Sequence, residues 1–275
     1  MERIRQAVEQ AKRERQDFSG DRSPRSISAR IGDAKAVVEK PTASFEYTET
    51  KTVDVSDEVR NTNRLVAAIN GHPMRDIYKM LRTRVFQEMK ANNWKSIVVT
   101  SPATGAGKTH TAINLAIAIA GDLSHTALLV DGDLRQPSLH RYFGYEPEYG
   151  LNDYLFSDVP LSKVLFHPNM DRLTVLPGRE PIYESAESLA SPKIVALLSE
   201  LRSRYSDRIV VVDMAPVLSV DDALALAPNI DCVLMVAEAG ETSRDDLAKA
   251  LEMLEGIPII GTVLNKVDKK VVSSY

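Results

Sequence analysis

The segment from residue 101 to residue 109, Ser-Pro-Ala-Thr-Gly-Ala-Gly-Lys-Thr, has residue types that could hold a polyphosphate. It follows the apolar run 97–100 and opens a helical stretch, so its backbone N–H groups would meet an anion at the positive end of a helix. Lys108 would contact the β- and γ-phosphates, and the Thr109 hydroxyl would ligate Mg²⁺. The residues that we expect to contact the nucleotide are Thr104, Gly105, Ala106, Gly107, Lys108, Thr109 and His110.

The strict phosphate-loop pattern requires a glycine five residues before Gly107, where this chain has Pro102. The match therefore fails at one position. The alternative is a glycine turn that precedes Lys-Thr by chance, but the order strand, loop, helix favours nucleotide binding.

Carboxylates follow two further apolar runs. Asp131 and Asp133 come directly after the run 127–130, and Asp213 follows the run 209–212. Because ligands of parallel α/β sheets bind outside the carboxyl ends of the strands, we expect these acids to converge on the phosphate loop. Carboxylate oxygens suit a divalent cation between phosphate oxygens, and Thr109, Asp131 and Asp213 are the expected metal ligands. A single acid could be an ordinary helix cap, but acids at two strand ends favour metal and nucleotide chemistry.

Asn265 begins the run Asn265-Lys266-Val267-Asp268 after the last apolar run, and this run resembles the guanine-reading motif of GTPases. An amide here could equally contact adenine, and an ordinary turn is the third interpretation. We include Asn265 among the expected nucleotide contacts and leave the base open.

The elements that must position these residues follow from hydrophobic periodicity. Short apolar runs alternate with amphipathic helical patterns, which is typical of a parallel sheet covered by helices on both faces. The sequence therefore predicts an α/β, three-layer P-loop NTPase domain over residues 64–268. The expected strands are 97–100, 127–130, 173–176, 209–212, 232–236 and 258–264, and the expected helices are 74–89, 109–120, 189–205, 221–227 and 243–254.

The segments outside this domain have a different composition. Ile4, Ala7, Val8 and Ala11 have helical spacing, which predicts an amphipathic helix over residues 1–17. Residues 18–63 are polar and without sustained period, as in a flexible linker, and 269–275 are predicted to form a flexible tail.

Composition excludes several classes of protein. The 275 residues are 44% hydrophobic and 26% charged, enough apolar residues for one full core. A net charge of −4 and a pI near 5.8 argue against a nucleic-acid partner. Cys232 is the single cysteine of the sequence, which excludes a disulfide scaffold and fits a reducing cytoplasm. The sequence shows no apolar stretch of the ~18 residues that a membrane span needs, so we expect a cytoplasmic protein.

Three segments together resemble the motifs of the bacterial tyrosine kinases. They are the loop 105–109, the run Asp131-Gly132-Asp133-Leu134-Arg135 and the run Asp213-Met214-Ala215-Pro216. These are P-loop autokinases of capsule and exopolysaccharide assembly. Their second motif, D-x-D-x-R, is matched fully, whereas Ala215 replaces the first proline of the third, D-x-P-P. Members of the family also lack the early glycine, so Pro102 fits. The resemblance covers residues 75–268.

The resemblance implies ATP and Mg²⁺ as cofactors and assigns roles to four catalytic residues. Lys108 would hold the β- and γ-phosphates. Asp131 and Asp133 would lie at the metal and at the incoming tyrosine hydroxyl, one acting as base, and Asp213 would reach the metal. The implied reaction is transfer of the γ-phosphoryl group of ATP to protein tyrosine.

The resemblance also implies partners. A kinase of this type works with a membrane chain-length regulator whose cytoplasmic tail activates it, which would place this chain peripherally at the inner membrane. Asp76, Lys79 and Arg82 occupy the positions of the E-x-x-R-x-x-R helix through which the family forms ring-like homo-oligomers. Only Arg82 matches that pattern fully. The family ends in a tyrosine cluster, whereas this chain offers one terminal phosphosite, Tyr275.

Two other functions remain open from the sequence. One is a switch ATPase of the same superfamily, which would carry an extra loop lysine where this chain has Ala103 and a membrane helix for which 269–275 is too short. The other is a module that binds ATP and regulates a polysaccharide partner without phosphotransfer, an interpretation that the single tail tyrosine allows.

Overall fold

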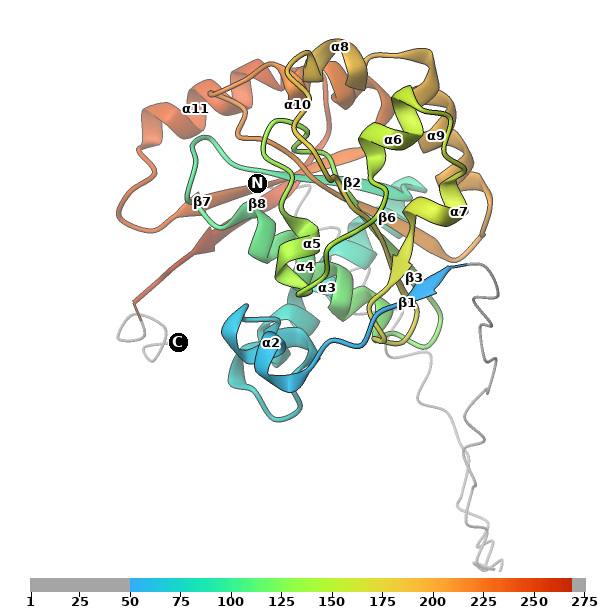
Figure 1. The fold of residues 1–275 in the computed structure, drawn as a ribbon. Coiled ribbons are helices and arrows are strands. Elements are labelled where there is room, and N and C mark those ends of the chain that lie inside the picture. Colours follow the sequence, from blue (N-terminus) through green and yellow to red (C-terminus); the bar gives the residue numbers. More distant parts are fainter. Residues whose placement is uncertain (1–49, 269–275) are drawn as a thin grey trace, which may run out of the picture. The chain divides into compact units, whose positions relative to one another are not determined.

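The computed structural model describes residues 50–268 (Figure 1). The predicted helix 1–17, the predicted tail 269–275 and its Tyr275 lie outside the described residues. The strands are β1 (Lys51–Thr52), β2 (Ser96–Thr100), β3 (Thr126–Asp131), β4 (Phe166–His167), β5 (Leu173–Leu176), β6 (Arg208–Asp213), β7 (Cys232–Glu238) and β8 (Ile259–Asn265). The helices are α2 (Asp57–Thr62), η1 (Val66–Ala68), α3 (Pro73–Asn92), α4 (Lys108–Ala120), α5 (Leu139–Tyr142), α6 (Leu151–Phe156), α7 (Leu161–Val164), α8 (Ser185–Leu189), α9 (Pro192–Ser203), α10 (Asp222–Leu226), η2 (Ala227–Asn229) and α11 (Arg244–Met253).

Within residues 50–268 the strands form one eight-stranded sheet in the order β1-β4-β5-β3-β6-β2-β7-β8. Every neighbouring pair is parallel except β4 and β5, which are antiparallel. The carboxyl ends of β2, β3 and β6, the central strands, therefore lie at one edge of the sheet. The six strands expected from the sequence are confirmed, and β1 and β4 are additions of two residues each.

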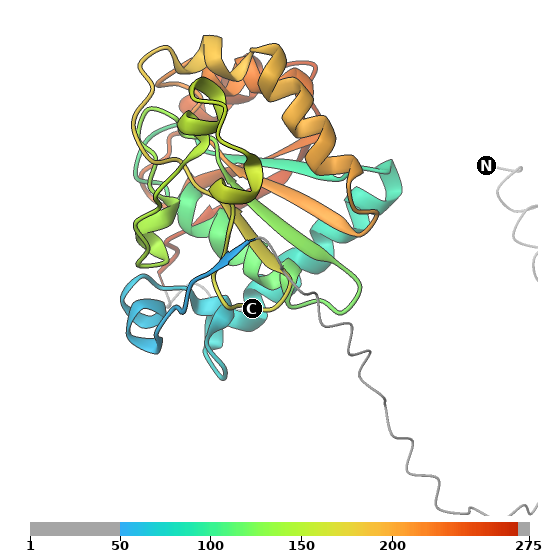
Figure 2. The same cartoon turned by 45° about the vertical axis from the view of Figure 1, so that its right-hand side comes forward.

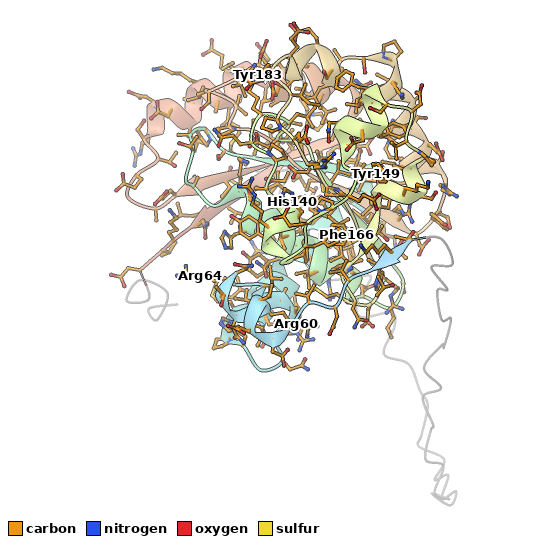
Figure 3. The ribbon with its side chains drawn as sticks, viewed as in Figure 1. Arg60, Arg64, His140, Tyr149, Phe166 and Tyr183 are labelled. Carbon is orange, nitrogen blue, oxygen red and sulfur yellow. The ribbon has the colours of Figure 1, made fainter. Side chains whose placement is uncertain are left out.

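Helices cover both faces of the sheet, as Figures 1 and 2 show. Successive residues of the central strands point to opposite sides, so Ile97 and Val99 pack into a core with α3 and α4, whereas Val98 packs into a core with α9 and α11. Strand β4 supports the first core through Phe166, whose ring lies 5.8 Å from that of Phe143 (Figure 3). The predicted three-layer α/β domain is confirmed.

The helix that starts at the phosphate loop is buried on all sides. Eleven residues of α4 are buried, because the helix lies between the sheet and α3. A hydrophobic helix without a polar face is stable only in such a position. Asn114 is its buried polar side chain at mid-length, and it accepts from Ala67 N (2.9 Å) and donates to Arg64 O (3.1 Å). Asn114 thus ties the segment before α3 to the helix that carries the site.

The folded region begins before residue 64. Residues 51–62, which the sequence analysis placed in the polar linker, include β1 and α2, and Val55 is 1% exposed in the first core. Ser56 caps α2 by accepting from Val59 N. Segments this short have no detectable period, which is why the sequence did not separate them from the linker.

The predicted protomer contact on α3 is not one continuous exposed face. Asp76 and Lys79 are exposed and form an ion pair of 2.8 Å. The Arg82 guanidinium instead donates to Ala118 O of α4 (3.1 Å) and lies over the Phe86 ring. The interpretation of all three as one exposed flank is therefore wrong for Arg82. Among residues 50–268, no helix is both long enough and apolar enough to span a membrane.

Candidate active site

The phosphate loop connects β2 to α4 and is shaped by two glycines with left-handed backbone. Gly105 has φ 85° and Gly107 has φ 88°, conformations that side chains disfavour. Gly107 is also the N-cap of α4, and a Cβ at this position would collide with the side-chain amide of Asn265. The loop therefore turns its backbone toward the N-terminus of a 13-residue helix, as an anion site requires.

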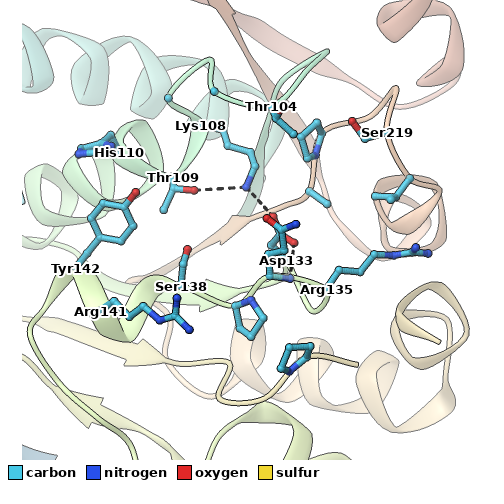
Figure 4. A pocket seen from close by; sticks show the side chains of 18 of the residues that line it. Thr104, Lys108, Thr109, His110, Asp133, Arg135, Ser138, Arg141, Tyr142 and Ser219 are labelled. Atoms are coloured by element: carbon cyan, nitrogen blue, oxygen red, sulfur yellow. Dashed lines mark hydrogen bonds and ion pairs between the residues drawn. The ribbon is translucent and has the colours of Figure 1, made fainter. Parts of the chain in front are cut away.

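Lys108 is held between carboxylates from two strand ends. Its Nζ donates to Asp133 Oδ2 at 2.9 Å (Figure 4). The same nitrogen lies 3.5 Å from Asp213 Oδ1. It also lies 3.4 Å from the Thr109 hydroxyl. Burial disfavours the ammonium, but Asp213 and Asp133 outweigh that effect and raise the pKa of Lys108. Lys108 is thus a charged, largely buried group at the start of α4.

Asp131 and Asp213 lie side by side because β3 and β6 pair in register at these two residues. Both are fully buried. Asp131 Oδ2 accepts from the backbone N–H groups of Ser138 (2.9 Å) and Leu139 (3.0 Å). Gly132, which follows Asp131, lies so close to β6 that a Cβ there would be 2.9 Å from Asp213 O. The glycine between the two aspartates therefore permits close packing of the two strand ends.

The pair of buried carboxylates is electrostatically strained. Burial and the neighbouring Asp213 raise the pKa of Asp131 to about 7. Burial also raises the pKa of Asp213, although Lys108 opposes this. Two neighbouring carboxylates in a poorly hydrated site repel each other, which favours binding of a proton or a cation between them.

The residues present fit a divalent cation. Asp131 Oδ1 and both oxygens of Asp213 are buried without a hydrogen bond of ordinary geometry. Within residues 50–268, no three His, Cys, Asp or Glu side chains gather as a ready-made metal site. A cation beside Asp131 and Asp213 would thus depend on phosphate oxygens and water, which is the usual situation of Mg²⁺ at nucleotides.

A pocket of about 620 Å³ opens over the phosphate loop (Figure 4). Of the predicted site residues, those that line it are Thr104, Gly105, Gly107, Lys108, Thr109, His110 and Asp133. Ala106, Asp131, Asp213 and Asn265 do not line it. The two buried aspartates lie behind the lining, with Asp213 in contact with Lys108. Asp133 is therefore the carboxylate that the pocket presents directly.

The opposite wall of the pocket contains residues that the sequence analysis did not assign. Tyr142 of α5 packs edge-on against His110, with 4.9 Å between the ring centroids, and both residues line the pocket. Arg135 donates from Nε to Ser185 Oγ (2.8 Å), and Ser185 donates to the buried Asp222 (2.7 Å). The D-x-D-x-R motif indicated Arg135, but Ser185 and Asp222 come from distant helices and have no local signal. Their contacts orient Arg135 at the rim.

Comparison with known proteins agrees with this geometry. Residues 97–274, more than half of the chain, match the family described as the CobQ/CobB/MinD/ParA nucleotide binding domain. The tyrosine-protein kinase YwqD of Bacillus subtilis is 31% identical over 190 residues, which cover 68% of this chain and 79% of YwqD. The chain belongs to the bacterial tyrosine kinase family. The solved kinase domain of the Escherichia coli tyrosine kinase ETK superimposes with a TM-score of 0.71 at 26% identity, covering 80% of this chain and 90% of that domain.

Relatives within this family differ in length. EpsB of Ralstonia nicotianae is 29% identical over 225 residues, which cover 78% of this chain and 29% of EpsB. The matched region therefore spans less than a third of the length of EpsB, whereas it covers most of YwqD. The residues that the family model matches, 97–274, include the phosphate loop and both acidic strand ends.

Proposed function

We propose that this chain is an ATP-dependent protein-tyrosine kinase that transfers the γ-phosphoryl group of ATP to tyrosine. The observation that carries the proposal is Lys108, which lies at the start of α4 between Asp133 and Asp213. A lysine at the N-terminus of a phosphate-binding helix, facing acids from two parallel strands, is the arrangement for a metal-bound polyphosphate. Membership of the bacterial tyrosine kinase family supports the choice of acceptor.

The phosphate loop would bind the nucleotide through the backbone of residues 104–109, with His110 beside it. Lys108 would turn from Asp133 to the β- and γ-phosphates, exchanging one anion for another at little electrostatic expense. Bound Mg²⁺ neutralises charge that develops on the transferred phosphoryl group. The residues to hold it are Thr109, Asp131 and Asp213, because Asp131 Oδ1 is buried without a hydrogen bond and Asp213 Oδ1 contacts the Lys108 ammonium at 3.5 Å.

Asp133 is the acid that we expect to receive the tyrosine proton. It lines the pocket, whereas Asp131 and Asp213 lie beneath. Movement of Lys108 to the phosphates would free Asp133 Oδ2 to accept a hydrogen bond from an incoming hydroxyl. Asp131 and Asp213 would remain with the cation. Of the two acids of the D-x-D motif, Asp131 would thus bind the metal and Asp133 would accept the proton.

The cellular role rests on the family resemblance. We propose that the chain regulates chain length and export of a capsular or exopolysaccharide, at the cytoplasmic face of the inner membrane. Its partner would be a membrane chain-length regulator whose cytoplasmic tail activates the kinase. The chain would assemble with itself in a ring through the exposed part of α3, with Tyr275 as phosphosite.

The test is a phosphotyrosine assay on purified protein given ATP and Mg²⁺, with Lys108→Met and Thr109→Ala as controls. Lys108→Met removes the cation that faces the phosphates, and we expect ATP affinity and labelling to fall at least about 100-fold. Circular dichroism checks folding, since Lys108 also neutralises Asp133 and Asp213. Thr109→Ala removes a metal ligand without changing charge.

Each outcome points to a function. Labelled wild type with unlabelled variants supports the kinase. ATP binding without phosphotyrosine would indicate a regulatory binding module, and release of phosphate to water without phosphotyrosine would indicate a switch ATPase. Wild-type affinity in Lys108→Met would contradict the assignment of the phosphate loop.

A further inference from the structure

The side chain of Asn265 contacts the phosphate loop from a distant part of the sequence. Asn265 is the last residue of β8, and its Nδ2 donates to Ala106 O at 2.8 Å. The same nitrogen faces Gly107 so closely that no side chain could be accommodated there. The contact joins residues 159 positions apart, so it exists only in the folded chain.

Asn265 is itself held in place from both sides. Its carbonyl accepts from Ala239 N at 2.9 Å, and it pairs with Glu238 at the end of β7. The next residue, Lys266, has a left-handed backbone (φ 57°) and donates from Nζ to Glu238 Oε1 at 2.8 Å. The backbone of Asn265 is therefore fixed at the end of a paired strand, which limits where its side-chain amide can lie.

The loop needs such a tie. Gly105 and Gly107 flank Ala106 and both have positive φ, so this stretch has the widest backbone freedom of the loop. Ala106 is 3% exposed and its carbonyl is occupied by the Asn265 amide, and neither Ala106 nor Asn265 lines the pocket. Holding this carbonyl back leaves the loop N–H groups available on the pocket side.

We propose that Asn265 is a positioning residue for the phosphate loop, which it holds in its phosphate-binding shape through Ala106 O. The inference rests on the proposed function. It differs from base recognition, the other role open to an amide at this position, because a base reader must face the nucleotide. In the structure the amide nitrogen of Asn265 is bonded to Ala106 O, and Asn265 does not line the pocket.

The proposal predicts that substitution of Asn265 affects the phosphates and not the base. Asn265→Ala deletes the donor, and Asn265→Asp sets a carboxylate against the Ala106 carbonyl. The matched control is Thr262→Ala, an exposed residue of the same strand. Thermal melting checks the fold of each variant, and Asn265→Ser replaces Asn265→Asp if the latter does not fold.

Binding of ATP, GTP and inorganic tripolyphosphate, each with Mg²⁺, is measured by calorimetry. We expect Asn265→Ala to weaken all three by a similar factor of about 3–10, the worth of one hydrogen bond, and Asn265→Asp to weaken them further. Loss of ATP affinity with unchanged tripolyphosphate affinity would assign Asn265 to the base and overturn the proposal. Unchanged affinity for all three would overturn it as well.

Hydrogen exchange without any nucleotide tests the tie separately from the proposed function. Amides of residues 103–108 should exchange faster in Asn265→Ala than in wild type, whereas Thr262→Ala should match wild type. Equal exchange in Asn265→Ala and wild type would contradict the tie even if ATP binds. Faster exchange in a protein that binds no ATP would keep the tie and reject the kinase.

Discussion

At the scale of residues, the site combines charges that are unfavourable until a ligand arrives. Asp131 and Asp213 are adjacent, fully buried and short of hydrogen bonds, and Lys108 offsets them from one side. Natural folds keep such arrangements where binding relieves the repulsion. Stability should therefore respond to pH and to divalent cations at this position.

Asp131→Asn should remove a pH dependence from the stability of the cation-free protein. The pKa of Asp131 is about 7 in the folded chain and near 3.8 in the unfolded chain, so the folded state holds the extra proton between these values. Stability thus falls as pH rises through about 4–7 and levels off above. Asparagine stays neutral, and its oxygen can still accept from Ser138 N and Leu139 N.

We expect the variant to melt about 2–8 °C above wild type at pH 8, corresponding to about 1–2 kcal/mol, with the difference shrinking towards pH 4. Differential scanning calorimetry across this range, with chelator present, measures it. The charged groups that face Asp131 are Asp213, Asp133 and Lys108, and they are unchanged in the comparison. A melting difference that is independent of pH would contradict the assigned titration.

At the scale of elements, the charged residues of α3 lie on two different sides of the helix. Arg82 faces α4 and satisfies the Ala118 carbonyl near the end of that helix. Asp76 and Lys79 lie on the exposed side and pair with each other. Arg82 therefore has an internal structural contact, whereas Asp76 and Lys79 remain on the exposed surface.

Arg82→Ala should lower stability, since it removes a hydrogen bond and the contact over Phe86. We expect a loss of about 1 kcal/mol and a melting point lower by about 2–4 °C. The double variant Asp76→Ala, Lys79→Ala should melt like wild type but shift the mass in solution toward monomer. Melting and analytical ultracentrifugation give both readouts. An unchanged mass distribution, with wild type oligomeric, would exclude this flank as the protomer contact.

At the scale of the whole molecule, the site is assembled at the carboxyl edge of the sheet from strands far apart in the chain. The phosphate loop follows β2, the paired acids are the last residues of β3 and β6, and β8 reaches the loop through Asn265. The last described strand thus ends beside the loop of its own chain. Tyr275 lies ten positions after Asn265 in the sequence.

Tyr275 should be phosphorylated between copies of the chain. A segment that leaves its own loop must turn back sharply to enter the same pocket, whereas an extended segment of ~3.3 Å per residue can reach a neighbour. The experiment mixes Lys108→Met protein, inactive with its tyrosine intact, with active Tyr275→Phe protein. Mass spectrometry should find phosphate on Tyr275 of the inactive copy. If wild type labels Tyr275 but the mixture does not, transfer occurs within one chain.

The sequence by itself determined the central strands, the long helices and the residues of the loop and acidic strand ends, because each is encoded by neighbours in the chain. Apolar runs such as 209–212 predict a buried strand without knowledge of its partners. The loop 105–109 is likewise predictable from its own residues, since the glycines at 105 and 107 can adopt the positive φ that the turn requires.

Only the tertiary structure decided which of these residues meet. The two-residue strands β1 and β4 exist because neighbouring chain segments pair with them, and no period can reveal elements so short. The contacts of Lys108 with Asp133, of Arg135 with Ser185 and of Asn265 with Ala106 join positions 25 to 159 apart. A side chain's partner depends on how the chain crosses the sheet, which local residue types do not specify. For this reason the inward turn of Arg82 and the contact of the Asn265 amide with the loop became visible only in the folded molecule.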